Sequence, residues 1–243
     1  SVVALLVGGW TGLRSLVGSL IGLCIIIFFV IPRILQGENP LIISIIGSAI
    51  FPGLSLYIIY GWKRMTHAAV LGMAISLFLT CVFSSFAVRI TRLSGFGNEN
   101  MMFLIQQSDK FLDMRGILLA GIIIGSLGVL DDLVIGQSSA VFQLSLSNPA
   151  LTFSELFKRA MIIGRDHVAA SVNTLILAYA GESLPMLLLF SITDVNFRLA
   201  LNVSYIAEEI VRALAGTTGL FLSVPIATLL ACLWVKGKNP IND

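Results

Sequence analysis

The sequence has few charged residues for its length, and this scarcity decides the class of protein. Only 12% of the 243 residues are charged, 57% are hydrophobic, and the mean hydropathy is +0.97. A soluble domain carries about 25% charged residues, so a water-soluble globular protein is excluded. We expect an integral membrane protein in contact with the lipid bilayer.

The residues that usually form metal and cofactor sites are also scarce. The chain has three cysteines and two histidines, and none of them forms a CxxC motif or a Cys/His cluster. The chain has no Gly-rich phosphate loop, no GxSxG motif and no basic run with interleaved aromatics. We therefore expect no metal, no cofactor, no nucleic-acid partner and no enzymatic activity.

The chain begins inside an apolar stretch. Residues 1–7 are too short to span a bilayer, which takes about 20 residues, and no basic region marks a signal peptide. We expect residues 1–8 to be the end of a transmembrane helix that begins upstream.

Longer apolar stretches predict an all-α fold, a polytopic transmembrane helix bundle that forms one domain over residues 1–243. Each stretch is close to the length of a transmembrane helix. The six predicted spans are residues 15–35, 40–60, 68–88, 116–135, 168–190 and 213–234.

Two polar segments predict helices that lie in the membrane interface. Thr152 and Glu155 match a capping box, which opens an amphipathic helix over 152–166. Glu208, Glu209 and Arg212 stand in a mixed segment before the last span, and this composition is typical of an interfacial helix.

The loop charges predict the orientation. Alternate loops gather more Lys and Arg than acids on one side, whereas the two signs nearly balance on the other. By the positive-inside rule, the basic side is cytoplasmic, and it includes the 152–166 helix and the C-terminus.

Asp131 and Asp132 follow directly on the apolar run of the fourth predicted span. An Asp at the centre of such a helix costs roughly 2.5–3.5 kcal/mol on insertion scales, so acids there usually face a protein interior or a watery cavity. Two adjacent acids in a low-dielectric setting do not both ionise easily, which suits them to loading and releasing a proton. Alternatively, the span ends at Leu130 and both acids are solvated.

Glycines share one helix face with Asp132. Gly121, Gly125 and Gly128 precede it at steps of four, three and four residues, and Asp131 is turned about 100° away. Such spacing lets a neighbouring helix approach closely. We expect these glycines to pack against a helix and Asp132 to lie in that contact.

Polar residues of the fifth predicted span lie at a matching depth. Asn173 and Thr174 come one to two turns after Asp166, and antiparallel spans would bring them level with the two acids. Together they predict a proton relay. Ordinary interhelical hydrogen bonds of Asn and Thr, and interfacial positions for Asp166 and its neighbours, are the simpler alternatives.

Two blocks, residues 120–132 and 163–181, together with 208–212 and 215–220, resemble the YibE/F family of bacterial multipass membrane proteins. The resemblance implies a bacterial cytoplasmic membrane location, and Asp132 fits the acid most typical of the family. The same blocks are more distantly similar to SecD/SecF and resistance–nodulation–division transporters, in which such acids form a proton relay.

Two functions remain open at this point. One is a proton-coupled transport-type protein, or its membrane half, in which the acids titrate. The other is a non-catalytic scaffold or assembly partner, whose acids are locked in bonds to another membrane protein or to a second copy.

The predicted topology has a direct test. Single cysteines at Asn98 and Asn148 should react with impermeant thiol reagents from opposite sides of the membrane, because an odd number of spans separates them. Reaction from the same side would contradict the predicted span count.

Overall fold

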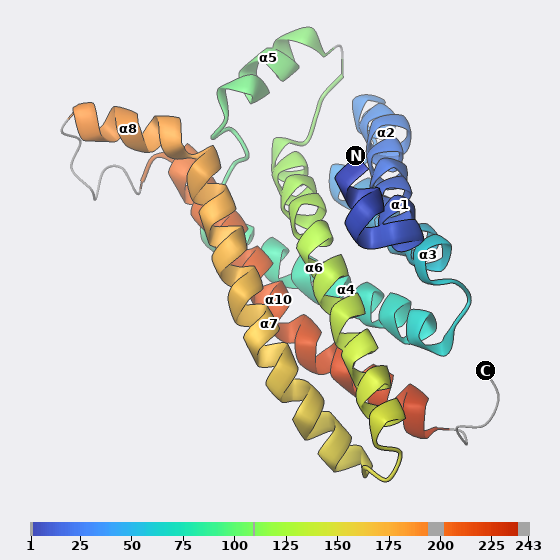
Figure 1. Ribbon diagram of the computed structural model, residues 1–243. Helices are drawn as coiled ribbons and strands as arrows, with labels where there is room; N and C mark the ends of the chain where they lie inside the picture. Colours follow the sequence, from blue (N-terminus) through green and yellow to red (C-terminus); the bar gives the residue numbers. More distant parts are fainter. Residues whose placement is uncertain (1, 109, 194–201, 238–243) are drawn as a thin grey trace.

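The computed structural model describes residues 2–108, 110–193 and 202–237, and all regular elements among them are helical (Figure 1). This confirms the predicted all-α fold. In chain order the helices are α1 Val2–Ile25, η1 Ile26–Val30, α2 Ile31–Leu35, α3 Pro40–Tyr60, α4 Arg64–Ile90, α5 Glu99–Gln107, α6 Met114–Ser147, α7 Phe153–Glu182, α8 Leu184–Ile192 and α10 Ser204–Lys236.

The candidate membrane spans coincide with the predicted apolar stretches. Among the described residues, five helical segments are long and apolar enough to cross a bilayer: Gly12–Leu35, α3, α4, α6 and α10. The sixth candidate is the pair α7 and α8, which meet at a bend of 57°. The polytopic helix bundle therefore agrees with the prediction, and the candidate spans number five, or six if the bent pair crosses the bilayer as one span.

The first helix turns within the segment expected to end an upstream span. Residues 2–8 belong to α1, and the backbone bends at Gly9, where φ is 53° and ψ is −142°. Glycine adopts a positive φ at no steric cost, so the turn falls at a residue suited to it.

The amphipathic segment at 152–166 and the fifth predicted span form one helix, α7. The capping box at its start is present as predicted. The Thr152 hydroxyl accepts a hydrogen bond from the Glu155 N–H at 3.3 Å, and the Glu155 carboxylate accepts one from the Thr152 N–H at 2.9 Å. The helix ends at Glu182, before the Leu184–Pro185 step that opens α8.

The prediction of a separate interfacial helix carrying Glu208, Glu209 and Arg212 is wrong for residues 204–212. These residues form the first turns of α10, which continues without a break into the last span. The side chains of Glu208 and Glu209 are buried. Residues 194–201, the start of the predicted interfacial segment, lie outside the described part of the chain.

The most extensive contact between described helices joins α4 and α10, and small residues bring them together. A Cβ added to Gly219 would overlap the Thr80 hydroxyl and lie 3.1 Å from the Thr80 Cβ, and one added to Gly72 would lie 3.5 Å from the Ala227 Cα. Small residues allow two membrane helices to approach to this degree. Larger side chains of α6, among them Ile123 and Leu130, then pack beside this contact.

Helix α6 lies at the centre of the bundle. It contacts α3, α4, α7 and α10, and Figure 1 shows it between α7 on one side and α1 and α3 on the other. The two acids of the predicted site are thus carried by the helix with neighbours on most sides.

The α4–α10 contact generates a stability prediction. Gly219→Val should lower the free energy of unfolding by about 1–3 kcal/mol, the usual cost of overpacking, because the new methyl groups meet Thr80. Thermal unfolding of the purified protein in detergent measures the loss.

Gly53→Val is the matched control, because a Cβ at Gly53 meets nothing within 4 Å. Equal stability of the two variants would contradict the proposed importance of this contact.

Candidate functional site

Asp131 and Asp132 lie inside α6, not at its end. The helix runs on to Ser147, and the next residues, Leu133 and Val134, are fully buried. The helix and the apolar interior of the bundle therefore continue past the acids.

The two carboxyls have different surroundings. Asp131 is partly buried, and its Oδ1 atom is buried with no hydrogen-bond partner among the described residues. Asp132 is exposed. Tyr60, at the end of α3, is close enough to interact electrostatically with both carboxyls. Adjacent positions on a helix point about 100° apart, so the pair spans the boundary between the interior and an open face.

Contacts between α6 and α7 fix the register of these two helices. A Cβ on Gly136 would lie 3.0 Å from the His167 Cε1, and a Cβ on Gly125 would lie 3.2 Å from the Tyr179 hydroxyl oxygen. The higher residue number on α6 is paired with the lower one on α7, so the two helices are antiparallel. Residues 171–173 are thus level with the acids. Of the two polar residues expected at this depth, Asn173 lies within this range and Thr174 directly follows it.

His167 is the α7 residue that the structure brings to the acids. It is close enough to Asp132 to interact with it electrostatically, and its ring lies against Gly136, one turn further along α6. Asp166, the predicted relay residue beside it, is exposed and is turned about 100° from His167.

Asn173 lies on a different side of α7 from the bundle contact. Leu175 is buried, and a Cβ on Gly216 of α10 would lie 3.2 Å from its Cδ2. Asn173 is about 160° around the helix from Leu175 and is exposed. Matching depth therefore does not bring Asn173 next to Asp131 or Asp132.

Thr174 shares a helix stripe with His167, seven residues before it. Its side chain is exposed, and its hydroxyl donates to the Ala170 carbonyl at 3.1 Å. Of the predicted relay partners on α7, Thr174 is the one on the same face as His167.

The glycine face of α6 is open in this chain, which differs from the close helix contact expected there. A Cβ at Gly121 or Gly128 would meet nothing within 4 Å, and Gly125 has only Tyr179 beside it. Asp132 lies on this same face and is exposed. The spacing of the glycines correctly places them on one face of α6 with Asp132, but it does not show whether another helix packs there.

A buried amide one turn beyond the acids was missed by the sequence reasoning. Gln137 is 1% exposed, and its Nε2 donates to the Ala160 carbonyl at 2.8 Å and to the Thr228 hydroxyl at 2.7 Å. These bonds join α6, α7 and α10 at one point. A Gln inside an apolar run was the available signal, but the predicted span ended at Ile135.

A second group of buried charges lies at the start of α10. The Glu208 Oε1 accepts a hydrogen bond from the Gly97 N–H at 3.1 Å, which holds the loop after α4 against α10. Glu209 and Arg212 form an ion pair at 3.5 Å, with side chains 11% and 23% exposed. The sequence did not reveal this group, because mixed charges in an apolar-rich segment are also typical of an interfacial helix.

Among the described residues, no group of three or more His, Cys, Asp and Glu side chains could hold a metal ion. His67 instead bonds the Tyr57 hydroxyl through its Nδ1 at 2.7 Å.

The buried ion pair generates a second prediction. Arg212→Met should lower the free energy of unfolding by about 1–3 kcal/mol, because it leaves the Glu209 carboxylate buried without its partner. The double variant Glu209→Gln/Arg212→Met should recover part of the loss, as thermal unfolding would show.

Arg33→Met is the control, because the Arg33–Glu38 pair is exposed and such pairs contribute less than about 1 kcal/mol. A larger loss for Arg33→Met than for Arg212→Met would contradict this assignment.

Comparison with known proteins relates this chain to one family. Neither a curated protein nor a solved structure matches it. Residues 1–237 match the family described as YibE/F-like protein, as the sequence resemblance predicts. Because the match covers nearly the whole chain, the protein belongs to the YibE/F-like family and is a multipass membrane protein.

Proposed function

We propose that the protein is a proton-coupled, transport-type membrane protein, or the membrane half of one, in which Asp131 and Asp132 exchange protons. One observation carries the proposal: a buried Asp131 oxygen that no described residue bonds, beside an exposed carboxyl on the same helix turn. A proton, a water molecule or a moving donor would satisfy that oxygen. Acids inside membrane helices commonly mark such relays.

The two acids have distinct roles in this proposal. Asp132 takes up the proton at the open face of α6, where His167 of α7 interacts with it. Asp131 carries the proton to the interior, toward Tyr60 of α3. Because the two side chains point about 100° apart, transfer between them requires a bridging water molecule or a side-chain rotation.

Helix α7 is the element suited to respond. It meets α6 at Gly125 and Gly136, and it ends at the bend before α8. Thr174 already shares the stripe of His167, whereas Asn173 and Asp166 would reach α6 only after α7 rotates about its axis.

An open glycine face supports the second candidate function, a scaffold or assembly partner. Gly121, Gly128 and Asp132 have open space beside them on the central helix. A helix of another membrane protein or of a second copy, with an Arg or Lys opposite Asp132, would fit it. Such a bond would lock the carboxyl instead of letting it titrate.

Both candidates place the protein in the bacterial cytoplasmic membrane, with the C-terminus in the cytoplasm. The basic loops support this orientation through the positive-inside rule. Neither candidate involves covalent catalysis.

The two functions give opposite results for one substitution. Asp132→Asn keeps the shape of the side chain but removes its titratable proton. Under the proposal, this variant and Asp131→Asn should both fail to complement a strain that lacks the protein. Growth rate, or proton flux into proteoliposomes, should fall by tenfold or more.

Thermal unfolding of the same variants separates lost function from lost folding. Glu38→Gln serves as the control, because Glu38 is an exposed carboxylate paired with Arg33. A fully functional Asp132→Asn protein with unchanged pH dependence would exclude the relay and favour the scaffold.

A further inference from the structure

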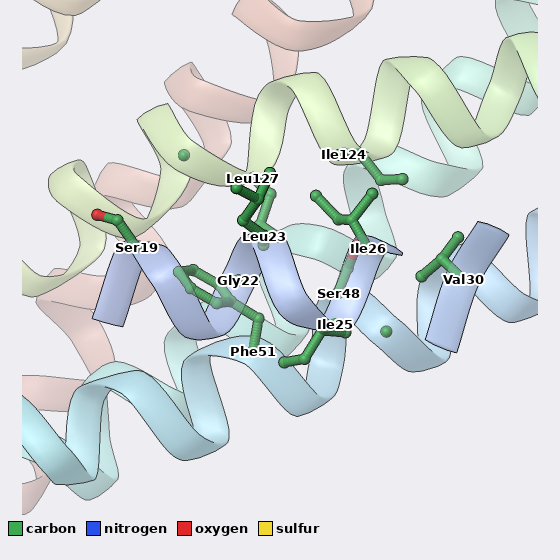
Figure 2. Close-up of a pocket in the computed structure, with 12 residues that line it drawn as sticks. Ser19, Gly22, Leu23, Ile25, Ile26, Val30, Ser48, Phe51, Ile124 and Leu127 are labelled. Atoms are coloured by element: carbon green, nitrogen blue, oxygen red, sulfur yellow. The ribbon is translucent and has the colours of Figure 1, made fainter. Parts of the chain in front are cut away.

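A cavity of about 290 Å³ lies between the first span, α3 and α6. Figure 2 shows Leu23 and Ile26 of the first span, Phe51 of α3, and Ile124 and Leu127 of α6 around it. Its wall is almost wholly apolar. Ligand pockets in proteins typically measure about 300–1,000 Å³ and combine apolar walls with a few placed polar groups, so this cavity is at the lower end of that range.

On one side of the cavity, the first span and α3 are in close contact. A Cβ on Gly22 would lie 2.7 Å from Phe51, and one on Gly47 would lie 2.7 Å from Val30. At the third wall, a Cβ on Gly128 would meet nothing within 4 Å. Close contact between the first span and α3 thus leaves open space on the side of α6.

Two irregular turns border this space. Residues Ile26–Val30 form a π-helix, whose wider turn is marked by the Ile31 N–H bonding the Ile26 carbonyl. Such turns are rare and frequently occur at functional sites. Across the cavity, Pro52 stands inside α3 and has no N–H to donate to the Ser48 carbonyl one turn earlier.

Two serines line the cavity, Ser19 and Ser48. The Ser19 hydroxyl already donates to the Ser15 carbonyl at 3.1 Å. Ser48 is 2% exposed, and its hydroxyl has no hydrogen-bond partner among the described residues. A buried hydroxyl without a partner is costly, by roughly 1–3 kcal/mol. A ligand oxygen would remove that cost.

We propose that this cavity binds an apolar, chain-like molecule that carries one oxygen function, whose hydroxyl or carbonyl pairs with Ser48. The walls accept the hydrocarbon part, since an apolar cavity of about 150 Å³ already holds a benzene molecule. The first span is the least buried of the candidate spans, so a molecule dissolved in the bilayer can reach the site along it.

Depth distinguishes this ligand from an ordinary phospholipid tail. Ser48 is eight residues, or about 12 Å, from the start of α3, near the middle of a helix as long as the hydrocarbon core. Phospholipid oxygens stay at the interface of that core, so a tail alone leaves the Ser48 hydroxyl unpaired. The ligand must carry its oxygen into the apolar region.

The α6 wall of the cavity adjoins the acidic pair. Leu127 and Gly128 precede Asp131 and Asp132 by one helical turn, about 6 Å. A bound molecule would therefore lie beside the carboxyls. Binding itself requires no proton exchange there, so the two proposals can fail separately.

Photolabelling tests the proposal with two probes, a long-chain alcohol that carries a diazirine and the alkane that carries the same diazirine. The full chain is reconstituted in phosphatidylcholine vesicles, and labelled peptides are mapped by mass spectrometry. The alcohol should label residues of the cavity wall, and excess unlabelled alcohol should suppress this labelling.

Gly128→Leu should abolish this labelling by filling the space. Gly121→Leu is the control and should not abolish it, because Gly121 lies outside the wall on the same open face.

Ser48→Ala should lower the preference for the alcohol over the alkane by roughly two- to tenfold, the effect of one hydrogen bond. Ser55→Ala is its control, since Ser55 is also a buried, unpaired hydroxyl of α3 but is not part of the wall. Equal labelling by both probes in the native protein would identify an ordinary lipid tail and overturn the proposal. Labelling that is spread evenly over exposed helices and unaffected by Gly128→Leu would also overturn it.

Discussion

The close contact of α4 with α10 is the constraint on which the rest of the bundle depends. In a bilayer, lipid tails are as apolar as Leu side chains, so helices associate through close packing and not through the hydrophobic effect. Gly219 against Thr80 and Gly72 against Ala227 provide that packing. Once these two helices are joined, α6 packs its Ile123 and Leu130 beside them and becomes the central helix. Gln137 then ties α6 to α7 and α10.

The central position of α6 gives its two acids different environments. Asp131 is partly buried, with Tyr60 of α3 close enough to interact with it, whereas Asp132 is exposed at the edge of the contact with α7, near His167. A pair of identical residues thus connects the interior with an open face. The same face of α6 carries Gly128, which also lines the apolar cavity. An acid that can hold a proton and a space that can hold an apolar molecule therefore adjoin on one helix.

Properties that depend on position along the chain could be predicted from the sequence. The apolar lengths gave the candidate spans, and Thr152 with Glu155 marked the start of α7. The depth of Asn173 relative to the acids was also predictable, because it follows from residue number. The resemblance of the 120–132 and 163–181 blocks identified the family.

Properties that depend on helix rotation and on neighbours could not be predicted. Asn173 is level with the acids but turned away from them, and His167 takes the place expected for Asp166. Glycine spacing marks a smooth face on α6, yet Gly219 of α10 makes the close contact, because spacing does not reveal which helix lies opposite. Glu208 and Glu209 resembled interfacial charges, since their partners, Gly97 and Arg212, are recognised only in the folded chain.

Infrared difference spectroscopy tests the central claim, proton exchange at the α6 acids, most directly. The full chain in lipid is titrated from acid to alkaline pH while the carbonyl stretch of protonated carboxyls is followed. The account predicts a band that disappears as pH rises and is missing from the Asp131→Asn/Asp132→Asn double variant. Identical titration of the native protein and the double variant would contradict it.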